Sequence, residues 1–498
     1  MTAQRASRAK AYGQFFTPAE VAATLVRWAI RDRDDRILDP ACGDGAFLAL
    51  HERTVGVEHD PRHAATARLR APSATVVEAD FFAWAGETNE RFDAVVGNPP
   101  FIRYHGFTGP MRAQALAQAR RFGADLPQLT SSWAPFVAAS ALLLQRGGRL
   151  AFVVPAEIGH AGYAAPLVEA LARRFERVVV TAVREKLFPH LSEDAWLLFA
   201  SGFDGATDAI EFAALDTFVP MAGPPNPSSR ITIPAYREAG NRLRPWLLPE
   251  SVLSAYRARA EGARSVRLGS VAKIGIGYVS GANAFFHLRP SAARSLRIPS
   301  RFLRPTVRRG GMLPEPAVTP AHVDRWLRDD EPNFLLHIEP DQRLPAALRE
   351  YLSSGAADDV RTAYKCRARD PWYCVPHVAV PDGFFTSMSG GAVKLTRNDA
   401  SCVATNSLHV VTMKRGGNFD WLRRSFASPL TRLSCELEGH PLGGGMLKIE
   451  PGEAQRLLIE LPETPPGLDR DLLERGIATL RRWRHCASSD GLTETTGE

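Results

Sequence analysis

Residues 15–200 alternate between short apolar runs rich in β-branched residues and longer stretches of mixed polarity. The apolar runs predict strands at 36–39, 54–58, 74–78, 92–96, 149–154, 177–183 and 195–200. They show no strict alternation of apolar and polar positions, which indicates a sheet covered on both faces. The stretches between them predict helices at 18–30, 61–70, 110–121, 131–145 and 164–174. Strands that alternate with helices favour a doubly wound α/β fold with parallel strands.

The helix over 18–30 has a well-defined start signal. Thr17 stands at a capping position, Pro18 suits the first turn, and Glu20 completes a T-x-x-E capping box. We therefore expect the Thr17 side chain to cap this helix.

Residues 218–250 differ from the preceding chain because proline, glycine and serine become frequent. Such a stretch is typical of a junction between domains. Beyond it, the regular alternation of strands and helices is lost. We therefore expect an α/β domain over residues 1–240 and a mixed α+β domain over residues 241–498.

The net charge differs between the two halves of the chain. Basic and acidic residues balance over residues 1–250, so the whole formal excess of +7 lies in residues 251–498. A basic face attracts a polyanion because each phosphate that it neutralises releases counterions. The second half is therefore a candidate for binding nucleic acid, although a solvated surface in an arginine-rich chain would look the same on charge alone.

Cysteine usage and hydropathy exclude several classes of protein. The six cysteines form no C-x-x-C pair and have no histidine cluster beside them, so we expect neither a zinc site nor a disulfide scaffold. The first residues contain no apolar segment typical of a secretion signal. The longest clean apolar run, Phe136 to Leu144, is too short to span a bilayer. We therefore expect a cytoplasmic protein that does not bind a membrane.

A glycine-containing loop follows the first strand. The sequence D-P-A-C-G-D-G-A-F begins at Asp39. Gly43 and Gly45 can take backbone conformations that other residues avoid, and they let a ligand approach closely. A tight strand-to-helix turn needs the same glycines, so the loop alone is weak support for a binding site. It matches neither G-x-G-x-x-G nor a P-loop, which favours a cofactor without a pyrophosphate.

Acidic residues follow at the ends of the next two strands. Glu58 ends the strand over 54–58, where such folds hold a ribose diol with two hydrogen bonds. After the third strand, Asp80 could accept from an adenine amino group and Phe81 could pack on its ring. Each carboxylate alone is more often a turn residue. Together, three successive strand ends carry the groups that an adenosine cofactor needs.

The fourth strand is followed by Asn98-Pro99-Pro100-Phe101. An exocyclic amine on a nucleobase is a poor nucleophile because its lone pair is delocalised into the ring. The Asn98 side-chain oxygen and the Pro99 carbonyl can hold its two hydrogens, which favours a tetrahedral nitrogen with a free lone pair. Phe101 can stack on the base, and a base in a duplex must be flipped out to reach such a pocket. A rigid strand-exit turn is the alternative interpretation.

With these motifs in this order, the sequence resembles the TaqI-like, gamma-class DNA adenine N6-methyltransferases of bacterial restriction–modification systems. The segment Y-G-Q-F-F-T-P over residues 12–18 matches the motif that precedes the cofactor motifs in that class. The glycine loop, Glu58, Asp80-Phe81 and N-P-P-F follow in family order. The aromatic residue of the last motif is often Tyr in the family and is Phe101 here. The resemblance implies a Rossmann-like class I methyltransferase doubly wound sheet, followed by a mixed α+β target-recognition domain.

The resemblance also implies a cofactor, a substrate and site residues. S-adenosyl-L-methionine is the expected cofactor, without a metal ion, and double-stranded DNA is the expected substrate. Phe188 lies in a segment similar to the one whose aromatic residue stacks on the flipped base, although it could equally be a core residue. The residues expected to hold the cofactor are Tyr12, Phe16, Thr17, Pro18, Asp39, Ala41, Gly43, Gly45, Glu58, Asp80 and Phe81. We expect a monomer that protects DNA from a separate cognate restriction endonuclease or serves a related defence system.

Other substrates remain open at this point. A cytosine-N4 DNA methyltransferase also modifies a conjugated amine, but its catalytic motif more often starts with Ser. RNA and protein amino-group methyltransferases share the glycine loop and N-P-P-F, yet generally lack the N-terminal motif and the large basic second half. A modification subunit that borrows its specificity from a partner is disfavoured by the length of chain beyond the junction.

Overall fold

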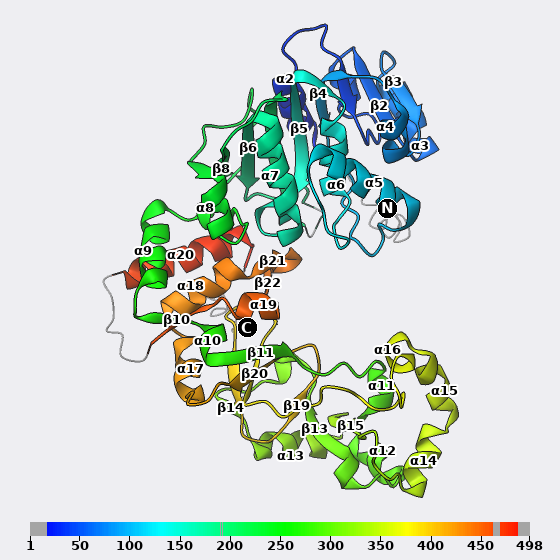
Figure 1. Cartoon of the computed structure of the whole chain (residues 1–498), viewed down its shortest axis with the longest axis vertical. Coiled ribbons are helices and arrows are strands. Elements are labelled where there is room, and N and C mark those ends of the chain that lie inside the picture. The colour runs from blue at the N-terminus through cyan, green and yellow to red at the C-terminus, as the bar shows by residue number, and fades with distance from the viewer. Residues whose placement is uncertain (1–16, 190, 192, 462–468, 487–498) are drawn as a thin grey trace, which may run out of the picture. The chain divides into compact units, whose positions relative to one another are not determined.

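The computed structural model describes residues 17–189, 191, 193–461 and 469–486. The chain divides into two compact units, which we call unit 1 (Met1–Leu248) and unit 2 (Pro249–Glu498) (Figure 1). Unit 1 contains one large sheet with its helices, and unit 2 contains several smaller sheets. Of the helices in the described part of the chain, none combines the length and the apolar composition that crossing a bilayer requires.

The sheet of unit 1 has nine strands in the order β3-β2-β1-β4-β5-β7-β6-β8-β9. Its strands are β1 (Ile37–Asp39), β2 (Thr54–Glu58), β3 (Thr75–Glu78), β4 (Phe92–Gly97), β5 (Leu144–Pro155), β6 (Phe175–Val183), β7 (Ala195–Phe203), β8 (Ala209–Leu215) and β9 (Ser229–Thr232). The strands from β3 to β5 pair in parallel, whereas β7 is antiparallel to both β5 and β6. The sheet is therefore mixed, with its parallel part at the end that carries the sequence motifs.

The helices of unit 1 connect these strands (Figure 1). They are α2 (Ala19–Ala29), α3 (Pro61–Arg70), α4 (Phe81–Glu87), α5 (Gly109–Phe122), α6 (Trp133–Ala141), α7 (Ala165–Arg174) and α8 (Ile233–Glu238). Short 3-10 turns are η1 (Leu48–Leu50), η2 (Ala156–Gly159), η3 (Gly162–Ala164) and η4 (Arg244–Leu247). Val21 and Leu25, one helical turn apart on α2, are buried in one apolar cluster with residues of β1, β4 and β5. Burial of this apolar stripe holds α2 against the sheet.

The strands and helices expected from the sequence of unit 1 are all present, with three corrections. The cap of α2 is Pro18 and makes no side-chain capping bond, so the expectation that Thr17 caps the helix was wrong. The helix expected over 131–145 ends at Ala141, because the apolar residues from Leu144 onward already belong to β5. The strands are not all parallel, because β7 returns between β5 and β6.

Unit 2 contains four small sheets rather than one large one. Their strand orders are β10-β23, β11-β20-β16-β18-β14, β12-β15-β13-β19 and β17-β22-β21. The strands are β10 (Ser265–Arg267), β11 (Ala272–Ile276), β12 (His287–Leu288), β13 (Leu303–Val307), β14 (Ala317–Val318), β15 (Phe334–Leu336), β16 (Gly383–Phe385), β17 (Met388–Ser389), β18 (Leu395–Asn398), β19 (Val403–Ala404), β20 (His409–Met413), β21 (His440–Leu442), β22 (Met446–Lys448) and β23 (Leu458–Glu460).

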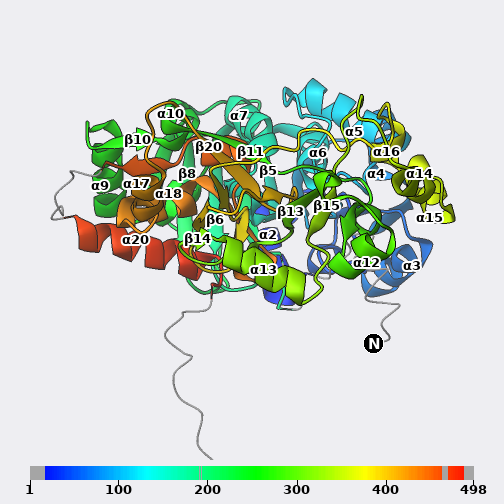
Figure 2. The same cartoon turned by 90° about the horizontal axis from the view of Figure 1, so that it is seen from below.

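The helices of unit 2 are mostly short. They are α9 (Glu250–Glu261), α10 (Leu268–Val271), α11 (Asn283–Phe286), α12 (Pro290–Ser295), α13 (Pro320–Arg328), α14 (Ala346–Leu352), α15 (Gly355–Thr362), α16 (Tyr364–Arg367), α17 (Phe419–Ser425), α18 (Pro429–Glu438), α19 (Pro451–Ala454) and α20 (Arg470–Trp483), with 3-10 turns η5 (Ser300–Phe302), η6 (Gly310–Met312) and η7 (Gly443–Gly445). Helix α20 packs against both α9 and α18, and the three lie side by side in Figure 1 and Figure 2. A mixed α+β composition was expected for this half of the chain.

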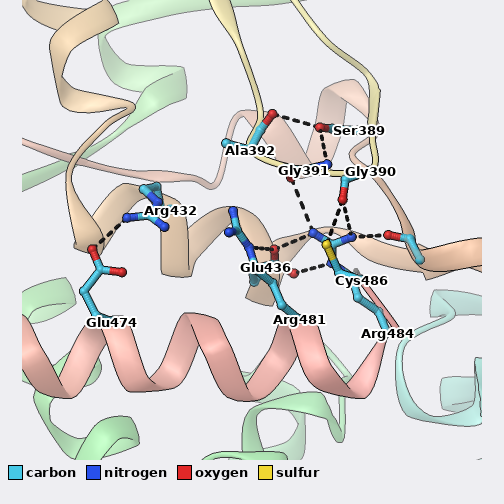
Figure 3. A network of polar contacts seen from close by, with 11 residues as sticks. Ser389, Gly390, Gly391, Ala392, Arg432, Glu436, Glu474, Arg481, Arg484 and Cys486 are labelled. Atoms are coloured by element: carbon cyan, nitrogen blue, oxygen red, sulfur yellow. Dashed lines mark hydrogen bonds and ion pairs between the residues drawn. The ribbon is translucent and has the colours of Figure 1, made fainter. Parts of the chain in front are cut away.

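A buried ion pair joins α18 to the end of α20 (Figure 3). Arg484 and Glu436 are 1% and 2% exposed, and Arg484 Nε and Nη2 each lie 2.9 Å from a Glu436 carboxylate oxygen. Arg484 also donates to the Gly445 carbonyl, and Arg481 Nε donates to Glu436 at 3.3 Å. A charge taken out of water is tolerated only when its hydrogen-bonding capacity is used in this way. The pair therefore ties three segments of unit 2 together.

We expect the Glu436→Gln protein to lose about 3 kcal/mol of unfolding free energy, because the substitution leaves the buried Arg484 guanidinium without its counter-charge. Urea unfolding followed by intrinsic fluorescence measures the loss. The matched control is Lys394→Gln, which breaks a 3.2 Å pair with Glu315 whose side chains are 49% and 60% exposed. That change should cost less than about 0.5 kcal/mol. Equal unfolding midpoints for Glu436→Gln and the wild type would contradict the structural role of the buried pair.

Candidate functional site

The strand ends that carry the sequence motifs share one edge of the sheet of unit 1. Strand β1 lies between β2 and β4, so the strand order reverses on either side of it. Open α/β sheets bind ligands at the carboxyl ends of their strands, next to such a reversal. The glycine loop after β1 and the Asn98–Phe101 loop after β4 both start at this edge.

Gly97, the last residue of β4, lies directly against the start of the glycine loop. A Cβ atom at this position would be 3.0 Å from Asp39 Oδ1 and 3.0 Å from Phe152 Cε1. Gly56 in β2 is equally confined, because its Cβ would lie 2.8 Å from Cys42 Sγ. A side chain at Gly56 would require Cys42 to move, and one at Gly97 would require Asp39 or Phe152 to give way. Glycine at these two strand positions therefore allows the glycine loop to pack closely on β2 and on the end of β4.

The glycine loop itself has two residues in the left-handed region. Gly43 has φ +53° and Gly45 has φ +83°. A Cβ at Gly45 would lie 3.0 Å from Ala67 Cα in α3, whereas one at Gly43 would meet no atom of the described chain within 4 Å. Gly45 is thus required by packing as well as by φ, and Gly43 borders open space where a ligand can approach the backbone.

Glu58 holds the glycine loop in place. Its side chain is 7% exposed, and its Oε2 accepts from the Gly43 N–H at 2.9 Å. Its Oε1 accepts from the Asp60 N–H at 2.8 Å. Each carboxylate oxygen can accept a further hydrogen bond. Glu58 therefore links two loops and retains the capacity to bind hydroxyl groups.

Asp39 is a buried carboxyl group with one oxygen to spare. It is 1% exposed, and its Oδ1 accepts from the Ala41 N–H at 3.2 Å. Its Oδ2 is buried and has no hydrogen-bond partner among the described residues. Burial raises the pKa of Asp39 to about 8, and the negative charge of Glu58 adds to the shift. An unpaired buried oxygen of this kind fits a site that receives a cationic or hydrogen-bond-donating ligand group.

The loop after β4 carries Asn98, Pro99, Pro100 and Phe101. Pro99 is buried, and the other three residues are half-buried. Phe101 packs against the apolar cluster that also contains Phe188, which is 8% exposed. The structure thus places both aromatic residues expected to stack on a base in one cluster.

Two further expected contacts are already used within the protein. The Asp80 side chain caps α4 and accepts from the Ala83 N–H at 2.9 Å. The Phe81 ring is 4% exposed and stacks on Phe136 with ring centroids 5.1 Å apart. Thr17 and Pro18 lie half-buried at the start of α2, whereas Tyr12 and Phe16 lie outside the described residues.

The site therefore offers two kinds of group. Carboxylate oxygens of Asp39 and Glu58 beside an open glycine suit a ligand with hydroxyl and amino groups. The amide of Asn98, the proline carbonyls and the ring of Phe101 suit a flat base with an exocyclic amine. No cluster of His, Cys, Asp or Glu with the makeup of a metal site occurs within the described ranges. All six cysteines lie in those ranges, and none of them forms a disulfide there.

Sequence reasoning overlooked the residues that support these loops. Gly97 and Gly56 lie inside apolar runs and look like ordinary strand residues. Ser132, far along the chain, makes three hydrogen bonds with the segment that follows Pro99. A glycine within a strand is a weak signal of close approach, whereas the partnership of Ser132 leaves no local pattern at all.

Two family profiles match the two parts of the chain. The family "N-6 DNA Methylase" matches residues 1–164. The family "Type II methyltransferase M.Eco57I, C-terminal domain" matches residues 242–485. The first match ends before the proline-rich stretch over residues 218–250, and the second begins within it.

Similar proteins are found both among known sequences and among solved structures. The type II methyltransferase M.AccI of Acinetobacter calcoaceticus is 18% identical over 477 residues, which cover 91% of this chain and 86% of M.AccI. The type II methyltransferase M.TthHB8I of Thermus thermophilus is 35% identical over 161 residues, which cover 30% of this chain and 35% of M.TthHB8I. The structure of the type IIL restriction–modification enzyme MmeI in complex with DNA has a similar fold, with 12% identity and a TM-score of 0.50 over 96% of this chain and 73% of MmeI.

The buried Asp39 predicts how stability depends on pH in the cofactor-free protein. Its folded pKa of about 8 lies above the ordinary value of 3.8, so the native state holds a proton that the unfolded chain releases. Stability should therefore fall as pH rises from about 4 to about 8, by up to about 1.4 kcal/mol per pH unit from this group. Urea unfolding of the wild type and of Asp39→Asn at pH 5, 6 and 7 tests this, because the substitution removes that contribution. Parallel pH profiles would contradict the assignment.

Proposed function

We propose how this chain, which is an adenine-specific DNA methyltransferase of the restriction–modification type, divides its reaction between named residues. Residues 1–240 bind the cofactor and carry out methyl transfer to N6 of an adenine flipped out of double-stranded DNA. Residues 241–498 recognise the target sequence. The order of the motifs, with the recognition domain last, supports the gamma class.

The cofactor implied by the family and by the class I methyltransferase fold is S-adenosyl-L-methionine. The donor set at the carboxyl edge of the sheet fits it, because the Asp39 Oδ2 atom lacks a partner within the described chain and Gly43 borders open space. Bound there, S-adenosylmethionine would supply a methyl group on a positively charged sulfur, which an amine can attack directly without a metal ion.

Each residue of this cradle has a separate task in the proposal. Glu58 accepts from the ribose hydroxyls, and its bonds to Gly43 and Asp60 keep the carboxylate oriented. Asp39 accepts from the ammonium group of the cofactor, and a cation at that position favours its ionised form. Ala41 and Gly45 shape the loop, whereas Asp80 and Phe81 border the adenine. The N-terminal motif with Tyr12, Phe16, Thr17 and Pro18 contacts the methionine end.

The catalytic loop prepares the amine for attack. The Asn98 side-chain oxygen and the Pro99 carbonyl accept the two amino hydrogens, which draws the nitrogen toward tetrahedral geometry and frees its lone pair. Phe101 stacks on one face of the base, and Phe188 is the candidate for a second aromatic contact. As the nitrogen–methyl bond formed, the sulfur–methyl bond of the donor would break and leave its electron pair on a neutral thioether, and the surplus amino proton would pass to the solvent.

One observation carries the proposal: Gly97, the residue before Asn98, packs so closely against Asp39 that a Cβ atom on Gly97 would lie 3.0 Å from Asp39 Oδ1. A methyl donor held by the glycine loop and an amine held by Asn98 are then neighbours, and orientation of two reactants supplies much of the rate enhancement in such reactions. The same loops on distant strands would bind both ligands without bringing them together.

DNA recognition completes the proposal. The whole basic excess of +7 lies beyond residue 250, which fits contacts with phosphates. The enzyme then acts as a monomer in the bacterial cytoplasm, close to the chromosome. A separate cognate restriction endonuclease is the expected functional partner, since methylation of the shared site protects the host DNA.

Asn98→Ala tests the catalytic assignment. Loss of the amide oxygen should slow methyl transfer at least about 100-fold, because an acceptor for the developing charge disappears. The dissociation constant for S-adenosylmethionine should change by less than about twofold, because Asn98 lies outside the cofactor cradle. Long-read sequencing of DNA from cells that express each protein scores N6-methyladenine in one short motif, and calorimetry measures cofactor binding.

Asn89→Ala is the matched control, because Asn89 is exposed and lies before β4. It should methylate DNA like the wild type. Methylation that persists in Asn98→Ala would refute the catalytic role. A wild-type chain that binds S-adenosylmethionine but modifies cytosine, RNA or protein would refute the substrate.

A further inference from the structure

Ser132 is bonded to the catalytic loop at three points, although it lies far from it in sequence. Its hydroxyl donates to the Pro100 carbonyl and accepts from the Ile102 N–H at 2.9 Å. Its own N–H donates to the Ile102 carbonyl at 2.9 Å. Ser132 is 0% exposed. These bonds hold the backbone at Pro100 and Ile102, on both sides of Phe101.

The position of Ser132 makes this pattern unusual. It is the N-cap residue of α6, where a serine hydroxyl ordinarily accepts from the helix's own backbone N–H groups. Here the N-cap makes no side-chain capping bond and has helical angles of φ −62° and ψ −30°. The helix therefore has no side-chain cap, and the Ser132 hydroxyl bonds to the catalytic loop instead.

The catalytic loop needs an external partner because of its prolines. Pro99 and Pro100 have no N–H, so the loop lacks two of the backbone donors that usually hold a turn. The Ile102 N–H, the next backbone donor along the chain, donates to the Ser132 hydroxyl, and this bond holds the loop in their place. With the Pro100 carbonyl also occupied by Ser132, the Pro99 carbonyl is the proline acceptor left for a substrate.

Ser132 is in turn anchored to the sheet. Its neighbour Trp133 donates from Nε1 to the Tyr163 hydroxyl at 2.7 Å, and Tyr163 donates to the Glu157 carboxylate. Burial raises the pKa of Tyr163 well above its ordinary value, so the hydroxyl keeps its proton. Glu157 lies in η2, directly after β5, the strand beside β4. The start of α6 is therefore fixed relative to the strand that carries the loop.

We propose that Ser132 is a positioning residue for methyl transfer: it fixes the peptide planes around Phe101 and thereby the Pro99 carbonyl and the ring that receive the target base. This role rests on the proposed function of the Asn98–Phe101 loop. Ser132 contacts neither substrate nor cofactor in the proposal and acts through the loop alone.

The test compares Ser132→Ala with Ser140→Ala in the full chain. Ser140 lies on the same helix, is 0% exposed, and its Oγ has no hydrogen-bond partner among the described residues. Ser132→Ala should lower the single-turnover methylation rate about 10- to 100-fold, because small displacements of reacting groups cost this much. Cofactor affinity should stay near wild type. The thermal midpoint should fall by a few degrees, because the Ile102 N–H loses its acceptor. Ser140→Ala should match the wild type in all three measurements.

A second variant separates positioning from a general role in folding. In the Phe101→Ala background, Ser132→Ala should slow the reaction by a smaller factor than in the wild type, since both changes act on the same loop. A wild-type rate in Ser132→Ala overturns the proposal, as does an equal loss of rate and cofactor affinity. An intact methylation rate in Asn98→Ala would instead overturn the proposed function, so the two failures are distinguishable.

A different observation, in unit 2, supports a second inference. Tyr364, the first residue of α16, is 70% exposed. Lys365 Nζ lies 5.3 Å and Arg367 Cζ 5.6 Å from the centre of its ring, and both cations are exposed as well. Proteins that bind nucleic acid combine aromatic faces with cations in this way, because rings pack on bases while cations neutralise phosphates.

The helix α16, which carries the exposed ring, is held by contacts on its inner side. Arg369 donates to the Val279 and Ser280 carbonyls, each at 2.7 Å. Gly281 has φ +87°, and a Cβ there would lie 2.9 Å from the sulfur of the buried Cys366. The helix α16 is thus clamped on its inner side, while Tyr364 faces solvent. A fixed backbone at Tyr364 lowers the conformational entropy that is lost on binding.

We infer that Tyr364, Lys365 and Arg367 form a contact surface for DNA in unit 2. The two cations neutralise backbone phosphates, and the ring packs on an adjoining base or sugar. This surface deepens the proposed recognition role of residues 241–498 and rests on it.

Binding of the full chain to a duplex with its methylated motif, at several salt concentrations, tests the surface. Tyr364→Ala should weaken binding about 10-fold without changing the salt dependence, and Tyr364→Phe, which keeps the ring, should bind like the wild type. Lys365→Ala with Arg367→Ala should lower the slope of log affinity against log salt by about 2. Wild-type affinity and slope in both variants would overturn the surface. A wild type that methylates no DNA would overturn the proposed function instead.

Discussion

The close packing of Gly97 against Asp39 constrains the edge of the sheet at which β1 and β4 end. A side chain at Gly97 would have to displace either Asp39 or Phe152, because its first atom would lie 3.0 Å from each. The same crowding buries Asp39 and raises its pKa to about 8. The close packing of the two loops and the raised pKa of Asp39 therefore have one cause, because both follow from the removal of water between β1 and β4. Such a carboxyl group suits the cationic cofactor group that we propose for this site.

Much of unit 1 could be predicted from sequence, and the reasons are visible in particular elements. Strands β1 to β4 are short apolar runs that end in Asp39, Glu58, Glu78 and Gly97, so their boundaries are marked by residue type. The candidate binding motifs could be recognised because each sits directly after a strand, and their roles stay predictions. The assignment as an adenine DNA methyltransferase followed from the same motifs and is confirmed by the related proteins.

Other features had no local signal. The run from Trp133 through Leu144 is apolar throughout, and a buried helix cannot be told from a buried strand in such a run, so the end of α6 was misplaced. The antiparallel direction of β7 depends on how the chain connects the strands, and the residue types within β7 do not reveal it. Thr17 matches a capping box, yet Pro18 takes the capping position and no capping bond forms. In unit 2, the partnership of Glu436 with Arg484 joins residues from different helices, and no spacing rule links them.

The reciprocal bonds between Ile102 and Ser132 also fix the points at which a longer excursion of the chain begins and ends. They close residues 103–131, including α5, into a loop whose entry and exit are pinned at the same place. The entropy of closing such a loop grows only slowly with its length, so insertions within it would disturb its pinned ends little. We therefore expect insertions at exposed positions of this excursion to leave the loop after β4 in place. The double proline and the distant serine make that loop a fixed frame from which the excursion leaves and to which it returns.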